Sequence, residues 1–183
     1  MPGELRLHGQ LSFDQNWLAY RNGFGPYQGE YWLGLERLHR LSQQCNLTSA
    51  RFEVHFCDAN RESTHSTYST FKVGSEADDY RLAISGRSGP RVWMAYTFTM
   101  LMPNTGMRFT TYDWDQDRKP NGNCAASSSY RSPQWGGWWF NWCGSGWITA
   151  YYIPQPAAKA SAGDHQTSVT HSQGIDLKLR PGL

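Results

Sequence analysis

Apolar and polar residues alternate in several short segments of the chain, as they do in a β-strand that buries one face. This alternation predicts strands over residues 51–56, 67–73, 80–85 and 175–180. A shorter run of bulky apolar residues, 31–33, predicts one more strand. The sequence contains no internal repeat, so these strands are expected to form one sheet system and not a series of similar units.

Two short helices are predicted before the first long strand. The first follows Ser12 or Asp14, either of which can cap it, and Gly23 ends it. The second covers residues 35–42, where Leu38 and Leu41 fall on one side.

The periodicity disappears after residues 107–109, and the chain beyond them is expected to fold into loops with few regular elements. Such a region needs other means of stabilisation, and a metal ion together with a disulfide would serve. Residues 154–173 are rich in Pro, Ala, Ser, Gly and His, which predicts a loose surface segment.

Composition favours a loop-rich globular protein over a helical bundle, because 9 Trp, 10 Tyr and 8 Phe occur beside 18 Gly and 9 Pro. The 183 residues suit one domain that is long enough to bury a core. A net charge of +2 with interspersed signs gives no electrostatic footprint for nucleic acid. No apolar run approaches the roughly 20 residues of a membrane helix, so membrane insertion is not expected, and the N-terminus does not read as a signal peptide.

Three carboxylates at alternate positions, Asp113, Asp115 and Asp117, form the most informative segment. Carboxylates at every second residue, completed by backbone carbonyls, are a common way to hold calcium. A solvated acidic turn is the competing interpretation, because Asp favours turns. An EF-hand is excluded, since its sixth and twelfth positions would hold Arg118 and Cys124 instead of Gly and Glu.

Four cysteines, Cys45, Cys57, Cys124 and Cys143, allow three pairings. None of them forms a Cys-x-x-Cys motif, which disfavours zinc. A bond between Cys124 and Cys143 would close a loop of about 20 residues, worth on the order of 3 kcal/mol. Asn46 begins an Asn-x-Thr triplet, which predicts glycosylation if the chain is secreted.

Catalysis is the least favoured class of function. The sequence contains no Gly-x-Ser-x-Gly elbow, and its six histidines form no His-Glu-x-x-His pair. His39 is expected to pack or to form a local hydrogen bond. We therefore expect the chain not to be an enzyme.

Several motifs occur in an order and spacing that identify a family. They are WLAYRNGFG (17–25), GEYWLG (29–34), LHRL (38–41), YSTFKVGSEA (68–77) with YRL (80–82), GMRFTTYDWDQD (106–117) and GWWFNWC (137–143). With them, the chain resembles a fibrinogen C-terminal (fibrinogen-related) domain from about residue 9 to 143. The variant GEYWLG followed by Leu-Glu resembles the angiopoietin-like branch.

The resemblance implies an α+β fold with a central antiparallel sheet, short helices and a loop-rich part that carries calcium and a ligand pocket. The chain would be a single partial domain over residues 1–183. Within it we expect a sheet-and-helix part (9–106), a calcium and pocket part (107–153), the loose segment (154–173) and a final strand (174–181).

The resemblance also implies a set of calcium ligands. Asp115 and Asp117 match the family's calcium carboxylates, and backbone carbonyls near Lys119 and Asn121 would complete the shell. Asp113 matches an acid that is not normally a direct ligand.

A disulfide beside the ligand pocket is a further implication, and Cys124 and Cys143 match its two half-cystines. The peptide bond before the second half-cystine is cis in several members, which predicts a cis Trp142–Cys143 bond here. Cys45 and Cys57 match no family disulfide, so a local bond and two free thiols both stay open.

The pocket next to Cys143 would be walled by Tyr130, Trp135 and Trp142, whereas Trp138 and Trp139 are expected in the core. Gly144 stands where the family usually has a histidine, which removes a polar donor from the pocket.

The implied function is that of a secreted, extracellular recognition module. Its partner would be a protein receptor or a glycan, and it would assemble through upstream segments absent from this sequence. The competing hypothesis is a degenerate or spliced fragment of an angiopoietin-like or fibrinogen-like protein, with no ligand of its own.

Overall fold

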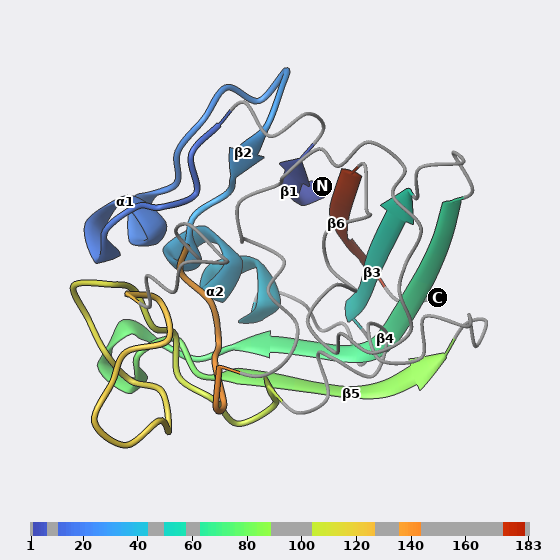
Figure 1. Ribbon diagram of the computed structural model, residues 1–183. Coiled ribbons are helices and arrows are strands. Elements are labelled where there is room, and N and C mark those ends of the chain that lie inside the picture. Colours follow the sequence, from blue (N-terminus) through green and yellow to red (C-terminus); the bar gives the residue numbers. More distant parts are fainter. Residues whose placement is uncertain are drawn as a thin grey trace, which may run out of the picture.

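A computed structural model of the chain describes residues 2–6, 11–43, 50–57, 63–88, 104–126, 136–143 and 174–181. Its main feature is a six-stranded antiparallel sheet with the order β2-β1-β6-β3-β4-β5 (Figure 1). The strands are β1 (Pro2–Arg6), β2 (Tyr31–Trp32), β3 (Ala50–Cys57), β4 (Ser63–Val73), β5 (Leu82–Ser88) and β6 (Gly174–Pro181). With its short helices, the architecture confirms the expected α+β class.

Most strands lie where the alternation predicted them, with three differences. β4 begins at Ser63, four residues before the predicted start. β5 begins at Leu82 and not at Tyr80, because Asp79 and Tyr80 have φ of 48° and 50° and turn the chain through the left-handed region. β1 was not predicted. It enters the sheet by pairing with β2 on one side and with β6 on the other.

The last strand lies in the interior of the sheet and not at its edge. β6 pairs with β3 over eight register positions, and apolar residues stand opposite each other at alternate positions, as at Val54 and Leu177. Cross-strand matching of this kind specifies register, because a slip of one residue would exchange the two faces. The two ends of the described chain therefore meet in the middle of the sheet.

Helix α1 (Trp17–Asn22) starts later than the sequence suggests. Asn16 caps it, since its side-chain oxygen accepts a hydrogen bond from the Ala19 N–H at 2.9 Å. Ser12 caps no helix and instead accepts a hydrogen bond from the Asp14 N–H at 3.3 Å, so both proposed caps were wrong. Gly23 ends the helix as predicted, with φ of 95°.

Helix α2 (Leu35–Gln43) covers the predicted segment and lies at the end of β4. The His39 Nδ1–H donates to the carbonyl oxygen of Val73 at 2.8 Å, which is the local role expected for that histidine. The Val73 N–H donates to Ser42 Oγ at 3.1 Å. Within the described ranges, no helix has the length and apolar character needed to cross a membrane.

An aromatic core joins the sheet and helices to a region without regular structure. Phe109 is fully buried, and its ring lies 4.9 Å from Trp139, 5.1 Å from Tyr20 and 5.9 Å from Trp32, measured between centroids. Trp138 and Trp139 are buried, which confirms their predicted place in the core. The interlocking rings hold residues 104–126 and 136–143 in place, although neither segment forms a helix of more than one turn or a strand.

Backbone hydrogen bonds attach these loops to the regular elements. The Leu82 N–H donates to the carbonyl of Met107 at 2.9 Å, and Thr110 and Trp138 exchange two hydrogen bonds of 2.9 and 3.0 Å. In Figure 1 the loops, drawn in yellow and orange, gather at the end of the molecule that also holds α1 and the 3-10 helix η1 (Glu76–Asp78).

Candidate functional site

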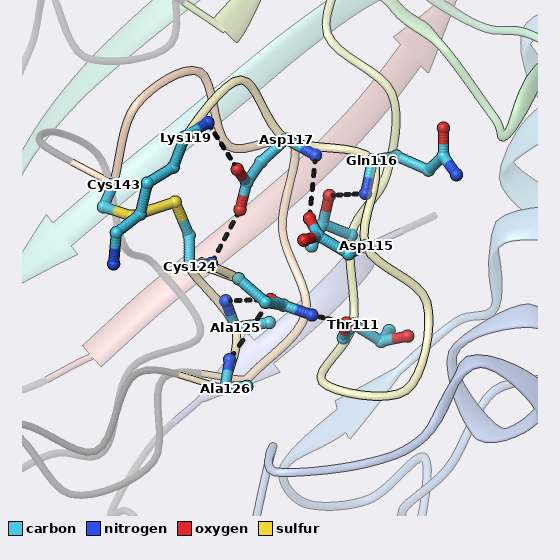
Figure 2. Close-up of a disulfide and its surroundings, with 11 residues drawn as sticks. Thr111, Asp115, Gln116, Asp117, Lys119, Cys124, Ala125, Ala126 and Cys143 are labelled. Atoms are coloured by element: carbon cyan, nitrogen blue, oxygen red, sulfur yellow. Dashed lines mark hydrogen bonds between the residues drawn. A yellow bond between two sulfur atoms is a disulfide. The ribbon is translucent and has the colours of Figure 1, made fainter. Parts of the chain in front are cut away.

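A disulfide between Cys124 and Cys143 joins the two loops (Figure 2). Cys124 is fully buried, whereas Cys143 is half-buried. The bond connects the end of the acidic loop to the end of the tryptophan-rich segment, 19 residues further along the chain. Cys45 lies outside the described residues, and Cys57 belongs to β3, where side chains are not described.

Asp117 organises the acidic loop. Its Oδ1 accepts a hydrogen bond from the Lys119 N–H at 2.7 Å, and its Oδ2 accepts one from the Cys124 N–H at 2.6 Å. Burial raises the pKa of Asp117, and the negative charge of the neighbouring Asp115 carboxylate raises it further. The two backbone hydrogen bonds act in the opposite direction and lower this pKa. The carboxylate is thus held in a fixed position in the part of the loop nearest the disulfide (Figure 2).

Asp115 lies beside it and is exposed to solvent. Its Oδ1 accepts a long hydrogen bond of 3.3 Å from the Asp117 N–H, and no other donor among the described residues hydrogen-bonds to its carboxylate. Asn121, further along the loop, has φ of 60°, where the chain turns back toward Cys124. Two carboxylates and a tightly turned stretch of backbone carbonyls are oxygen donors, and they fit a hard cation such as calcium.

A soft-metal site does not fit the same place. The ligand atoms of Asp117, Cys124 and Cys143 lie within 4.8 Å of one another, a spacing that would suit a metal. The two sulfur atoms are bonded to each other, however, and a disulfide offers no thiolate. The remaining ligand atoms are oxygens, so a zinc–thiolate site is excluded in this loop.

Asp113 has a different role from the other two acids. Its Oδ1 accepts hydrogen bonds from the Trp17 N–H at 2.9 Å and from Thr111 Oγ1 at 2.7 Å. The next residue, Trp114, packs on Trp17 and donates its indole N–H to Asp79 at 2.9 Å. Asp113 therefore attaches the loop to the first turn of α1.

Asn123 holds the loop together, and the sequence reasoning gave it no role. Its Nδ2 donates to the carbonyls of Thr111 at 2.9 Å and Tyr112 at 3.3 Å. Its Oδ1 accepts from the N–H groups of Ala125 at 2.7 Å and Ala126 at 3.2 Å. An Asn that bonds the backbone two and three residues ahead is a known turn signal, so its place just before Cys124 could have suggested this function.

The segment before Cys143 exposes one large aromatic side chain. Trp142 is 62% exposed, and the preceding Asn141 accepts a hydrogen bond from the Arg118 N–H at 2.9 Å. This bond and the disulfide tie Trp142 to the acidic loop from two sides. Tyr130 and Trp135, the other predicted pocket residues, and Asn46, the predicted glycosylation site, lie outside the described residues.

The expectation of a cis bond between Trp142 and Cys143 is wrong for this structure, in which no described peptide bond is cis. A non-proline cis bond costs about 3–4 kcal/mol, so the trans form is the default wherever the surroundings do not enforce the alternative. Cys143 instead has φ of 42°, in the left-handed region that few non-glycine residues adopt.

Comparison with known proteins identifies the family. The family model for the C-terminal globular domain of fibrinogen beta and gamma chains matches residues 4–181. Human fibrinogen C domain-containing protein 1 is 34% identical in an alignment 187 residues long, which covers 96% of this chain and 37% of that protein. The human fibrinogen gamma chain is 34% identical over 170 residues, which cover 85% of this chain and 36% of the relative. The chain thus spans little more than a third of the length of these relatives.

Solved structures agree on the fold. The fibrinogen-like globe domain of human ANGPTL2 matches with a TM-score of 0.79 and 25% identity, over 98% of this chain and 79% of the other. A lamprey fibrin D-dimer, solved with the peptide Gly-His-Arg-Pro-amide, matches with a TM-score of 0.72 and 24% identity, over 98% and 60%. Because relatives of both the fibrinogen and the angiopoietin-like kind occur, the angiopoietin-like branch stays a prediction. The chain belongs to the family of fibrinogen C-terminal globular domains.

Proposed function

We propose that this domain is a secreted recognition module, stabilised by calcium, that binds a protein or carbohydrate ligand beside Cys143. The disulfide between Cys124 and Cys143 carries the proposal, because it links the acidic loop to the segment that exposes Trp142. A site at such a junction can be formed by loops alone, provided that something rigid holds them.

Calcium would be held by the carboxylates of Asp115 and Asp117 and by backbone carbonyls near Lys119 and Asn121. When bound, the ion would supply the positive charge that offsets two neighbouring carboxylates and gathers the carbonyls around it. Asp117 already accepts two backbone hydrogen bonds, so it needs little reorganisation. Asp115 is exposed and would lose side-chain freedom on binding.

Trp142 would form one wall of the ligand site. An exposed indole offers a flat apolar face that is cheap to desolvate, which suits a sugar ring, an acetyl group or a peptide side chain. Tyr130 and Trp135 would complete the wall. The lamprey fibrin structure, with its bound Gly-His-Arg-Pro-amide, is consistent with peptide recognition by this fold. We propose that the domain acts by binding and not by catalysis.

Further proposals concern the whole protein and the organisation of the domain. Secretion would make Asn46 available for glycosylation, and upstream segments would build the oligomer. The loop-rich part over residues 107–153 would carry the site, and the sheet-and-helix part over residues 9–106 would support it.

Calcium titration of the Asp115→Asn variant tests the metal site. We expect its calcium dissociation constant to rise by about tenfold or more, because the number of charged ligands sets the affinity of oxygen sites. Its melting temperature without calcium should change little, since the carboxylate makes one long hydrogen bond. Calorimetry and thermal melting with and without calcium measure the two effects, because a ligand that binds only the folded state raises the melting temperature.

Asp113→Asn is the matched control, with the same loss of charge in the same loop. Its carboxylate is engaged by Trp17 and Thr111, so calcium affinity should stay near that of the unchanged domain. Equal losses of affinity in the two variants would indicate a diffuse electrostatic effect, and absence of calcium binding by the unchanged domain would refute the metal site.

Replacing Trp142 with alanine tests the ligand site. Binding of Gly-His-Arg-Pro-amide and of an array of glycans, N-acetylated sugars included, would be measured by surface plasmon resonance. For a probe that binds, we expect the substitution to cost about 2 kcal/mol or more, as for an aromatic hot-spot residue.

The control for this experiment is Tyr27→Ala. Tyr27 is equally exposed, at 62%, but packs on Tyr31 at the start of β2. If both variants bind like the unchanged domain, the ligand does not use Trp142. If no probe binds in any calcium condition, the hypothesis of a fragment without its own ligand is favoured.

A further inference from the structure

The chain contains two Asn-Gly dipeptides, Asn22–Gly23 and Asn121–Gly122. This dipeptide is the most prone to spontaneous deamidation, because glycine has no side chain to hinder the attack of its own nitrogen on the Asn amide carbon. The attack forms a five-membered succinimide and releases ammonia. Water then opens the ring at either carbonyl and leaves aspartate or isoaspartate. The reaction needs only water, and its rate depends on how freely the backbone moves.

Asn121–Gly122 is open to this reaction. Asn121 is exposed and lies in a turn with φ of 60°. The part of the chain that the structure describes accepts no hydrogen bond from the Gly122 N–H, so that nitrogen is not held away from the Asn121 side chain.

Lys119 adds a favourable charge at the same place. Its side chain reaches over Gly122, so that a Cβ on that glycine would lie 3.0 Å from Lys119 Cε and 3.1 Å from Nζ. A nearby ammonium group stabilises the negative charge that develops on the attacking nitrogen and on the amide oxygen. Figure 2 shows the Lys119 side chain extending beside the disulfide.

Asn22–Gly23 has the same two residue types but is protected. Asn22 ends α1, and the Gly23 N–H donates a hydrogen bond of 2.8 Å to the carbonyl of Ala19. The Asn22 carbonyl accepts from Arg37 at 3.1 Å. Attack by the Gly23 nitrogen would require the end of the helix to open first.

We propose that Asn121 is a site of deamidation in this domain, and that its conversion to isoaspartate weakens the calcium loop. In isoaspartate the main chain runs from Cα through Cβ and Cγ of residue 121 to the nitrogen of Gly122. The backbone is therefore longer by one methylene group at this position. The carbonyls near Lys119 and Asn121 could then no longer converge with Asp115 and Asp117. This second consequence rests on the proposed calcium site, whereas the modification itself does not.

The experiment incubates the intact domain in mildly alkaline buffer, with calcium in one arm and a chelator in the other. Peptide mapping then quantifies isoaspartate at positions 121 and 22. With chelator we expect about tenfold more at 121, which corresponds to roughly 1.4 kcal/mol of local opening at Gly23. Equal amounts at the two positions, or more at 22, would overturn the proposal.

Three controls test separately the structural cause of the difference, the residue that reacts and the effect of calcium. In denaturant the difference between the two positions should vanish; if it persists, structure is not its cause and the inference fails. Asn121→Gln should abolish the product at 121, because ring closure through the longer side chain is unfavourable, and should leave position 22 unchanged. Calcium should slow the reaction at Asn121 several-fold. If calcium leaves that rate unchanged while position 22 still forms little isoaspartate, the result would support the modification at Asn121 and contradict the proposed calcium site.

Calcium titration of the isolated isoaspartate form completes the test. Ion exchange separates both deamidated forms from the unmodified domain by their extra negative charge, and peptide mapping identifies the fraction that carries isoaspartate. We expect its calcium affinity to be lower by about tenfold, comparable with the loss of a carboxylate ligand. Affinity equal to that of freshly prepared protein would refute the effect on the loop.

Discussion

Replacing Phe109 with alanine is expected to lower the free energy of unfolding by about 3–5 kcal/mol, the usual cost of emptying a buried phenylalanine site. Its ring is fully buried among rings from α1, β2 and residues 136–143, so no single neighbour can move in to fill the cavity. For a domain of this size the melting temperature should fall by roughly 6–20 °C. Calorimetric or fluorescence-monitored melting measures the change.

Tyr112→Ala is the control, because it removes an aromatic ring three positions away that is 46% exposed. Its effect should stay within about 0.5 kcal/mol, as for most surface substitutions. If Phe109→Ala costs less than the control, the aromatic cluster is not what holds the loops. A calcium affinity that falls together with stability in Phe109→Ala would further indicate that this core positions the acidic loop.

Removing the disulfide by replacing both Cys124 and Cys143 with alanine is expected to cost about 3 kcal/mol, the chain-entropy value for a loop of this length. The same change should weaken calcium binding. The Cys124 N–H donates to Asp117 Oδ2, and without the bond to Cys143 the position of this donor is no longer constrained. Thermal melting in the presence and absence of calcium separates the two contributions.

Two outcomes would contradict this prediction. Mapping of unreduced peptides from the unchanged protein should yield one peptide pair linked through Cys124 and Cys143, and finding these two thiols free would remove its basis. A doubly substituted domain that binds calcium as tightly as the unchanged one would show that Asp117 does not depend on the disulfide for its orientation.

The sequence predicted those local features whose physical cause lies within one short segment of the chain. The alternation of apolar residues predicted β3, β6 and most of β4 and β5, because burial of one face requires it. Gly23 predicted the end of α1, because the position needs positive φ. The motifs predicted the family and, through it, the pairing of Cys124 with Cys143.

Features that depend on distant partners were missed. Trp17, at the start of α1, donates its N–H to Asp113, which lies 96 positions further along the chain. The choice of Asn16 over Ser12 as the helix cap was also missed, although its partner Ala19 is only three residues away. The strand predicted to begin at Tyr80 begins at Leu82, because the backbone of Tyr80 is left-handed, and the alternation of apolar residues does not report backbone conformation. Asn123 bonds carbonyls 11 and 12 residues upstream, a relation that spacing alone does not reveal.

The sequence by itself determined most of the strand segments, the end of α1 at Gly23, the family and the run of three aspartates. Only the tertiary structure decided that these three chemically identical acids differ in role. Asp113 accepts a hydrogen bond from the first residue of α1. Asp117 is partly buried and accepts hydrogen bonds from backbone N–H groups, whereas Asp115 is exposed to solvent. The reason is physical: a carboxylate's function depends on which donors and how much water surround it, and those neighbours come from segments far apart in the chain.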